Sequence, residues 1–493
     1  MSLAGLADLV LADPALAAAL AETSVRTEDL TGPTPLRPFL VAGLARTGRT
    51  VLAVTATTRE AEQLTAELGD LLDPATVAYY PSWETLPHER LSPRSDTVGR
   101  RLAVLRRLRH PGTDATTGPL SVVVAPVRSL LQPQVKGLGD LDPVELTTGA
   151  TAEIERVVEG LVGAAYSRVD LVEKRGEFAV RGGIVDVFPP TEDHPVRVEF
   201  WGDEVEEIRS FAVADQRTID KLDRLWAPPC RELLLTPQVR ERAAALGRAH
   251  PELLEITDKL AQGIAVEGME ALIPVLVDEL ELLVDLLPSD AQVLVLDPER
   301  ARARAHDLVA TSEEFLGASW AAAASGGQAP IDLQAASYRE LGDVRTHALD
   351  LGESWWTLSP FGLDDGAVVP DGLALNPPEM GPNDQVRRIQ AAPTYHGDVD
   401  RALADIAQWH GDGWTVVVMH QGHGPAQRMV EALGERDLPA RLVEDLPTGA
   451  DVNPKLVTVT CGGLAHGLVD EGQRLVIVTG EDIVGAKAST RDK

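Results

Sequence analysis

The chain has 493 residues, enough for three or four domains that each bury a core of their own. Its 45 Lys and Arg against 76 Asp and Glu give a net charge of -31, which argues against a strong duplex-binding surface, because such a surface needs clustered positive charge. No apolar run reaches the length of a membrane span. The two cysteines, Cys230 and Cys461, lie far apart without metal-ligand spacing, so we expect a reducing, cytoplasmic location.

The first region of the chain alternates helix and strand signals. Val51–Thr55 is a continuous apolar run typical of a buried strand. Thr57 and Glu60 then form a capping box, which predicts a helix that ends at Gly69. A second apolar strand is predicted at residues 121–125. Strands separated by helices predict a parallel α/β sheet.

One predicted helix carries a basic outer face beside an apolar stripe. The arginines concerned are Arg100, Arg101, Arg106, Arg107 and Arg109, and the stripe is Val98, Leu102 and Leu105. A solvated helix face is the favoured interpretation, because charged residues ordinarily occupy the side of a helix that faces water.

Residues 176–218 are typical of short strands separated by glycine and proline turns. The run VRVEFW alternates its side chains between two faces, with Val196, Val198 and Phe200 on one and Arg197, Glu199 and Trp201 on the other. A tryptophan beside an arginine on a charged face has the composition of an interface hot spot. The alternative is that Trp201 covers a neighbouring domain of the same chain.

Helical periodicity returns after this strand-rich segment, and residues 231–350 are expected to complete the first sheet. A segment rich in Pro, Gly and Asp at 361–383 predicts a linker. Strand and helix patterns then alternate again through 384–486, which predicts a second α/β domain, and the polar residues 487–493 are expected to be disordered.

Two motifs resemble a phosphate-binding loop and a metal site, but the residues around them do not support these functions. Residues 43–50, GLARTGRT, resemble a phosphate-binding loop, but a helix is predicted before them and a strand after them, and Arg49 replaces the lysine. His420 and His423 lie three residues apart, but a zinc site needs three or four ligands. We therefore predict no metal site and no catalytic centre in these residues.

Three segments, in the same order, resemble the bacterial transcription-repair coupling factor (Mfd) family and, more distantly, UvrB. They are YPSWETLPHERLSPRSDTVGRRLAVLRR from Tyr80, GEFAVRGGIVDVFPP with RVEFWGDEVEEIRSFAVADQRT from Gly176, and GMEALIP from Gly268. The resemblance implies an α/β fold in which a UvrB-like parallel-sheet domain (1–145 and 231–350) is interrupted by a β-rich insert (146–230). A second α/β domain of unknown role follows.

The resemblance also places an ancestral nucleotide loop at residues 30–38, LTGPTPLRP. This segment keeps Gly32 but has three prolines, which lack amide donors, and it has Arg37 without a Lys-Thr pair. We therefore expect a degenerate loop without ATP hydrolysis and no cofactor for this chain. In the family, ATP and Mg²⁺ serve a motor that is absent from these residues.

The resemblance further implies a non-catalytic module that docks UvrA through the insert. The carried-over contact residues are Arg181, Arg197 and Trp201, the last standing where a phenylalanine is expected. By the same resemblance, RNA polymerase and double-stranded DNA would bind through domains that are absent from these residues. The chain is thus expected to be a piece of a longer protein. No membrane is expected as a partner. Two alternatives remain open: a UvrB-like ATP-dependent damage-recognition subunit, and a structural scaffold that buries the Trp201 face.

Overall fold

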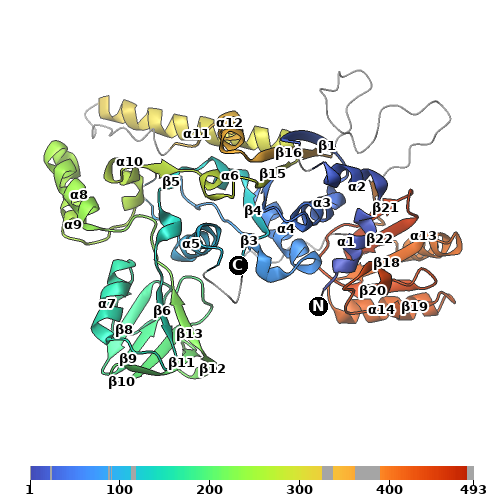
Figure 1. Cartoon of the computed structure of the whole chain (residues 1–493), viewed down its shortest axis with the longest axis horizontal. Coiled ribbons are helices and arrows are strands. Elements are labelled where there is room, and N and C mark those ends of the chain that lie inside the picture. Colours follow the sequence, from blue (N-terminus) through green and yellow to red (C-terminus); the bar gives the residue numbers. More distant parts are fainter. Residues whose placement is uncertain are drawn as a thin grey trace.

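The computed structural model describes residues 2–22, 25–86, 89, 91–112, 118–324, 337–360 and 389–485. The predicted linker at 361–383 and the predicted tail at 487–493 lie outside these residues. Within the described part, three strand-containing bodies follow one another: a central parallel sheet, a β-rich insert below it, and a last α/β body beside it (Figure 1).

The central sheet has six parallel strands. In spatial order they are β1 (Thr27–Thr31), β16 (Ser354–Ser359), β15 (Gln292–Leu296), β2 (Val51–Thr55), β4 (Val122–Pro126) and β3 (Val77–Tyr79). The inner strands β2, β4 and β15 are buried at every residue, as expected for a sheet covered on both faces. The predicted parallel α/β sheet is confirmed, and it continues to Ser359, beyond residue 350 where the sequence-based boundary ended it.

Alternate residues of the inner strands pack into two separate hydrophobic cores, one on each face of the sheet. Val51, Ala53 and Leu294 pack under α1 (Ala4–Leu11), α3 (Arg37–Arg46) and α4 (Thr58–Leu71). Leu52, Val54 and their neighbours pack under helices of the opposite face. Those helices are α5 (Ser95–Arg109), α6 (Val127–Leu131), α11 (Pro298–Ala324) and α12 (Leu341–Leu351).

The predicted capping box at the start of α4 is present, with Thr57 and Glu60 bonded reciprocally. The predicted end of this helix at Gly69 is wrong, because α4 continues to Leu71, which is fully buried in the core. Tertiary burial thus outweighs the weak helix propensity of one glycine.

The insert is a six-stranded sheet flanked by a helix and a two-stranded ribbon. Its strands, in spatial order, are β12 (Thr218–Leu222), β11 (Glu204–Phe211), β10 (Val196–Trp201), β9 (Ile184–Val187), β8 (Glu177–Arg181) and β7 (Ser167–Arg168). Helix α7 (Ile154–Gly163) and the ribbon of β6 (Val144–Thr147) with β13 (Arg224–Ala227) complete it. Val196, Val198 and Phe200 are buried in its core, as the alternation predicts.

A helical lobe follows the insert. It comprises α8 (Pro237–Ala249), α9 (Leu254–Ala261) and α10 (Ile273–Leu276), and its core closes over Trp83 from the central body. The short ribbon of β5 (Gln134–Val135) with β14 (Leu280–Glu281) connects this lobe to the central body.

The last α/β body has a six-stranded sheet in the order β17 (Ile389–Ala391), β21 (Leu468–Asp470), β22 (Leu475–Thr479), β18 (Thr415–His420), β20 (Val457–Cys461) and β19 (Ala440–Leu442). Helices α13 (Val399–Gly411), α14 (His423–Gly434) and α15 (Gly480–Val484) accompany it. The strands β18, β19, β20 and β22 agree with the predicted elements and are mutually parallel, whereas β17 and β21 form an antiparallel edge that the sequence did not indicate.

The first and last bodies share one hydrophobic core, with α1 lying between them (Figure 1). Leu3 and Leu6 of the N-terminal segment pack in the same cluster as Met419 of β18. None of the described helices is by itself long and apolar enough to cross a membrane. The bent pair of α1 with α2 (Pro14–Ala21) passes that test by length and composition only.

The basic helix α5 is not a free basic face. Arg101, predicted on its outer side, has a fully buried side chain whose Nε donates to Glu232 Oε1 at 2.5 Å. Its Nη1 donates to the carbonyl of Pro81 at 2.9 Å, and the guanidinium lies over the Tyr80 ring. Glu232 stands just after the insert, so this buried pair connects the chain leaving the insert to α5.

We predict that Glu232→Gln lowers the free energy of unfolding by about 3–5 kcal/mol, because it leaves the Arg101 guanidinium buried without a counter-ion. Thermal or urea unfolding of the purified chain measures the effect. Arg156→Ala, which removes one partner of an exposed pair with Glu153, is the matched control and should change stability little. Equal stabilities for the two variants would contradict this role of the pair.

A second buried carboxyl, that of Glu353, stands immediately before β16. The residue is 1% exposed, and neither carboxyl oxygen has a hydrogen-bond partner among the described residues. Burial raises the pKa of Glu353 to about 8, and the nearby negative charge of Asp285 adds to the rise. A raised pKa means that the folded state binds this proton more tightly than the unfolded state does.

Stability from the Glu353 proton is therefore fully present below the ordinary pKa of 4.5 and is lost as pH rises toward about 8. The loss follows a slope of about 1.4 kcal/mol per pH unit. We predict that Glu353→Gln flattens the stability profile in this window and makes the chain more stable than the parent at pH 8. Urea unfolding at several pH values tests it, and identical profiles would exclude a protonated Glu353.

Candidate functional sites

The insert presents two tight turns at one end of its sheet. The β8–β9 turn contains Gly182 with φ 60°, and the β10–β11 turn contains Gly202 with φ 63°, a region that favours glycine. Phe200 N donates to Gly183 O at 2.8 Å, so the two turns lie beside each other. Arg181 ends β8 and Trp201 ends β10 at this edge.

Trp201 is 79% exposed, the most exposed of the large hydrophobic residues described. It pairs with Glu204 across the β10–β11 hairpin, after a bulge between Glu199 and Phe200. The scaffold interpretation required this ring to pack within the chain. The described residues leave it uncovered, so packing of Trp201 against this part of the chain is contradicted.

Arg181 is exposed, and its Nη2 donates to the carbonyl of Asp170 at 2.7 Å. A carbonyl oxygen holds the guanidinium in place without neutralising its charge. Arg181 therefore offers both a positive charge and further N–H donors to a partner.

Arg197 lies on the same face as Trp201 along β10, as predicted, but it is held differently from Arg181. Its Nε donates to Asp186 Oδ1 at 2.7 Å and its Nη2 to Asp186 Oδ2 at 2.8 Å. This hydrogen bonding raises the pKa of the Arg197 guanidinium, and only 15% of the side chain is exposed. This pairing could not be predicted from local patterns, because it depends on the register of β9 against β10.

The rest of this face carries a ladder of compensated charges. Arg209 on β11 pairs with Glu199 on β10 and with Glu207 at 2.7 Å. Lys221 on β12 pairs with Glu207 at 3.3 Å. Opposite charges across neighbouring strands stabilise the sheet and leave little net charge over its middle.

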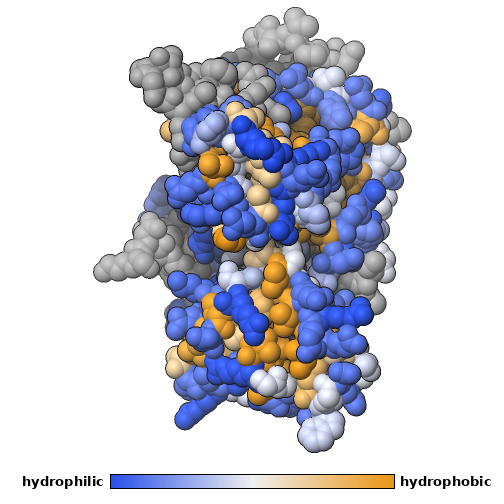
Figure 2. Space-filling view, turned by 90° about the vertical axis from the view of Figure 1, so that its left-hand side faces the viewer, coloured by the Kyte–Doolittle hydropathy of each residue, from blue (hydrophilic) through white to orange (hydrophobic). Residues whose placement is uncertain are grey.

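A different side of the insert also exposes apolar surface. Helix α7 lies at the lower left of Figure 1, on the side that faces the viewer in Figure 2, where hydrophobic residues gather in the middle of the lower half between hydrophilic ones. Val162 on α7 is 58% exposed. A single exposed valine is ordinary, whereas an exposed tryptophan beside an uncompensated arginine is not.

The ancestral nucleotide loop follows β1 in the central body. Gly32 N donates to Ser359 O at 3.0 Å, so this amide is used by the sheet. A 3-10 turn, Thr34–Leu36, then leads directly into α3, with Leu36 N bonded to Pro33 O. The segment has no run of free amides that could surround a phosphate, which a functioning loop needs.

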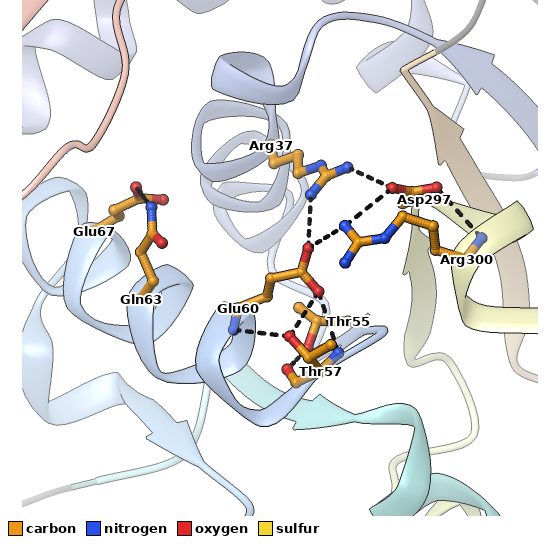
Figure 3. A network of polar contacts seen from close by, with 8 residues as sticks. All are labelled: Arg37, Thr55, Thr57, Glu60, Gln63, Glu67, Asp297 and Arg300. Carbon is orange, nitrogen blue, oxygen red and sulfur yellow. Dashed lines mark hydrogen bonds and ion pairs between the residues drawn. The ribbon is translucent and has the colours of Figure 1, made fainter. Parts of the chain in front are cut away.

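Charged side chains fill the space in front of this loop (Figure 3). Arg37 at the start of α3 lies 3.5 Å from Asp297, and Arg300 lies 2.6 Å from Glu60 of α4. The cross contacts are Arg37 to Glu60 at 3.9 Å and Arg300 to Asp297 at 3.4 Å. Burial lowers the pKa of Arg37, and the two carboxylates oppose that effect.

The network balances two cations with two anions at the carboxyl end of β15, where open parallel sheets commonly bind ligands. A crevice of about 220 Å³ beside it is lined by α4 and also by Ala465 and His466 of the last body. A phosphate entering here would meet Glu60 and Asp297, so the residues present do not suit a nucleotide triphosphate.

The other two motifs fit their structural context. Residues 43–50 span the end of α3 and the turn before β2, the helix-then-strand order that the sequence analysis predicted, opposite to a phosphate loop. His420 ends β18, and His423 begins α14 with a 3.4 Å contact to Glu444. Among the described residues no group of three possible ligands could hold a metal ion.

Comparison with known proteins agrees with this arrangement. Residues 144–233, which comprise the insert, match the family model of the UvrB interaction domain. The transcription-repair-coupling factor of Mycobacterium bovis is 44% identical over 99% of this chain, and that of Myxococcus xanthus is 30% identical over 95%. The UvrABC system protein B of Gemmatimonas aurantiaca is 30% identical over 45% of the chain and 31% of its own length.

The chain spans 40% of the length of the two coupling factors. The similarity to them covers the central body, the insert and the last body, whereas the similarity to the UvrB-type protein covers less than half of the chain. The chain is therefore related to the N-terminal region of the transcription-repair-coupling factors, and it contains a UvrB interaction domain.

Proposed function

We propose that this chain is the recruitment part of a transcription-repair-coupling factor, and that its insert docks UvrA to begin nucleotide excision repair. The observation that carries the proposal is Trp201, which is 79% exposed and stands at the same end of the insert sheet as Arg181, within the UvrB interaction domain. An exposed aromatic ring beside an arginine is the composition of an interface hot spot.

The electrostatics of the insert support an acidic partner patch of limited size. Arg181 has an uncompensated guanidinium, whereas Arg197 and Arg209 are each paired with carboxylates. A planar guanidinium can bind a carboxylate with two hydrogen bonds, and an adjacent aromatic ring adds contact area. The partner site is therefore expected to combine an acidic group with an apolar pocket.

A UvrB-like ATP-dependent role is less well supported. The charged network of Arg37, Glu60, Asp297 and Arg300 occupies the place of the nucleotide phosphates, and the loop lacks free amides. We assign ATP and Mg²⁺ use, and contacts with RNA polymerase and double-stranded DNA, to other parts of the longer relatives. A cytoplasmic location fits this role and the two free cysteines, Cys230 and Cys461.

We predict that Trp201→Ala and Arg181→Ala each weaken UvrA binding by about 1–3 kcal/mol, because each removes a central anchor of the proposed surface. Calorimetry with purified UvrA measures the affinity. Val162→Ala is the matched control, since it also removes an exposed apolar side chain of the insert but lies on α7. Unchanged affinity in both test variants would argue against docking through this face.

We predict that the chain binds no ATP at millimolar concentration with Mg²⁺ present, because the loop prolines and the carboxylates of Glu60 and Asp297 exclude the phosphates. Fluorescence anisotropy with a labelled ATP measures binding, with an active P-loop ATPase as positive control. Saturable binding that Arg37→Ala abolishes would show instead that the degenerate loop still holds nucleotide.

A further inference from the structure

The guanidinium of Arg197 is held by several contacts at once. It directly faces Asp186 across β9 and β10, and the two side chains form two parallel hydrogen bonds. Its Nη2 also donates to Gln216 Oε1 at 3.1 Å, and its guanidinium lies 4.6 Å from the centre of the Phe211 ring. These contacts fix the plane and the rotation of the guanidinium. They use Nε and Nη2, which leaves Nη1 as the nitrogen that can donate to a partner.

Asp186 is the buried member of this pair. It is 2% exposed, so its carboxylate depends on Arg197 as a counter-ion. On the other side of β10, Arg197 directly faces Arg209, a like charge that would be unfavourable without compensation. Arg209 is paired with Glu199 and Glu207. Asp186 therefore balances the charge of Arg197 and not that of Arg209.

We propose that Asp186 is a positioning residue of the UvrA surface: it holds Arg197 in one orientation and cancels its charge, so that Arg197 offers a fixed hydrogen-bond donor and not a free positive charge. This inference depends on the proposed function. The two arginines then have different roles. Arg181 offers a positive charge to the partner, whereas Arg197 offers a hydrogen-bond donor in a fixed orientation.

The division has a consequence for salt dependence. Attraction between exposed charges is screened as ionic strength rises, whereas a short hydrogen bond from a pre-oriented donor is affected much less. Arg181 should therefore account for most of the salt dependence of UvrA binding at this face. A donor that is already oriented also loses less side-chain entropy on binding.

The test measures the affinity of the chain for purified UvrA at roughly 50 mM and roughly 200 mM salt, together with the melting temperature of each variant. Asp186→Asn removes the charge but keeps a similar shape. We expect it to weaken binding about tenfold at the higher salt and to make binding more salt-dependent, because Arg197 is then charged but loosely held. Arg181→Ala should instead make binding less salt-dependent.

A matched control separates positioning from stability. Glu270 is also 2% exposed and pairs with Arg231 at 2.9 Å, but it lies outside the insert. Glu270→Gln should lower the melting temperature and leave UvrA affinity unchanged. Affinity for Asp186→Asn equal to that of the parent, or tighter, would overturn the proposal, because it would mean that Arg197 acts equally well as a free charge.

Arg197→Lys gives an independent test if Asp186→Asn folds poorly. Lysine keeps the charge beside Asp186 but cannot make the two parallel bonds, so binding should again weaken about tenfold while the fold is retained. Parent-like binding by Arg197→Lys would refute the positioning role. Failure of the parent chain itself to bind UvrA would instead remove the proposed function, which distinguishes the two conclusions.

Discussion

One buried ion pair, Arg101 with Glu232, joins helix α5 of the central body to the chain that leaves the insert. Arg101 is fully enclosed, and Glu232 also accepts a hydrogen bond from Trp83 Nε1 at 3.0 Å. The pair connects α5 to the chain leaving the insert, beside the core of the helical lobe. A buried charge is stable only when its partner lies beside it. Few placements of the two segments are therefore possible, because other placements would leave the charge of Arg101 unpaired. This pair therefore favours one placement of the chain leaving the insert against α5.

Much of the fold could be predicted from local patterns. The apolar runs of β2, β4 and β15 indicate buried parallel strands, and alternation along β10 places Trp201 and Arg197 on the face away from the insert core. These predictions succeed because each depends only on side chains that are neighbours along the chain.

Features that depend on distant partners could not be predicted. Periodicity predicts Arg101 on a solvated helix face, because its partner Glu232 is 131 residues away and local spacing carries no information about so distant a residue. The pair of Arg197 with Asp186 depends on strand register, and the network of Arg37 with Asp297 joins segments on either side of the insert. Alternation therefore predicts that Arg197 and Trp201 share one face, but it does not predict that Arg197 is paired with a carboxylate and Arg181 with a carbonyl.

Several arginines at the two candidate sites are paired with carboxylates, and this bears on how the chain can recognise a partner. A net charge of -31 gives the chain an overall repulsion toward acidic proteins. In the network at the ancestral loop, Arg37 and Arg300 are paired with Asp297 and Glu60. At the turn end of the insert sheet, Arg181 is held by a carbonyl and not by a carboxylate, and Trp201 is exposed at the same end. Recognition on such a chain must therefore come from short-range contacts at that end, where a fixed geometry counts for more than long-range attraction.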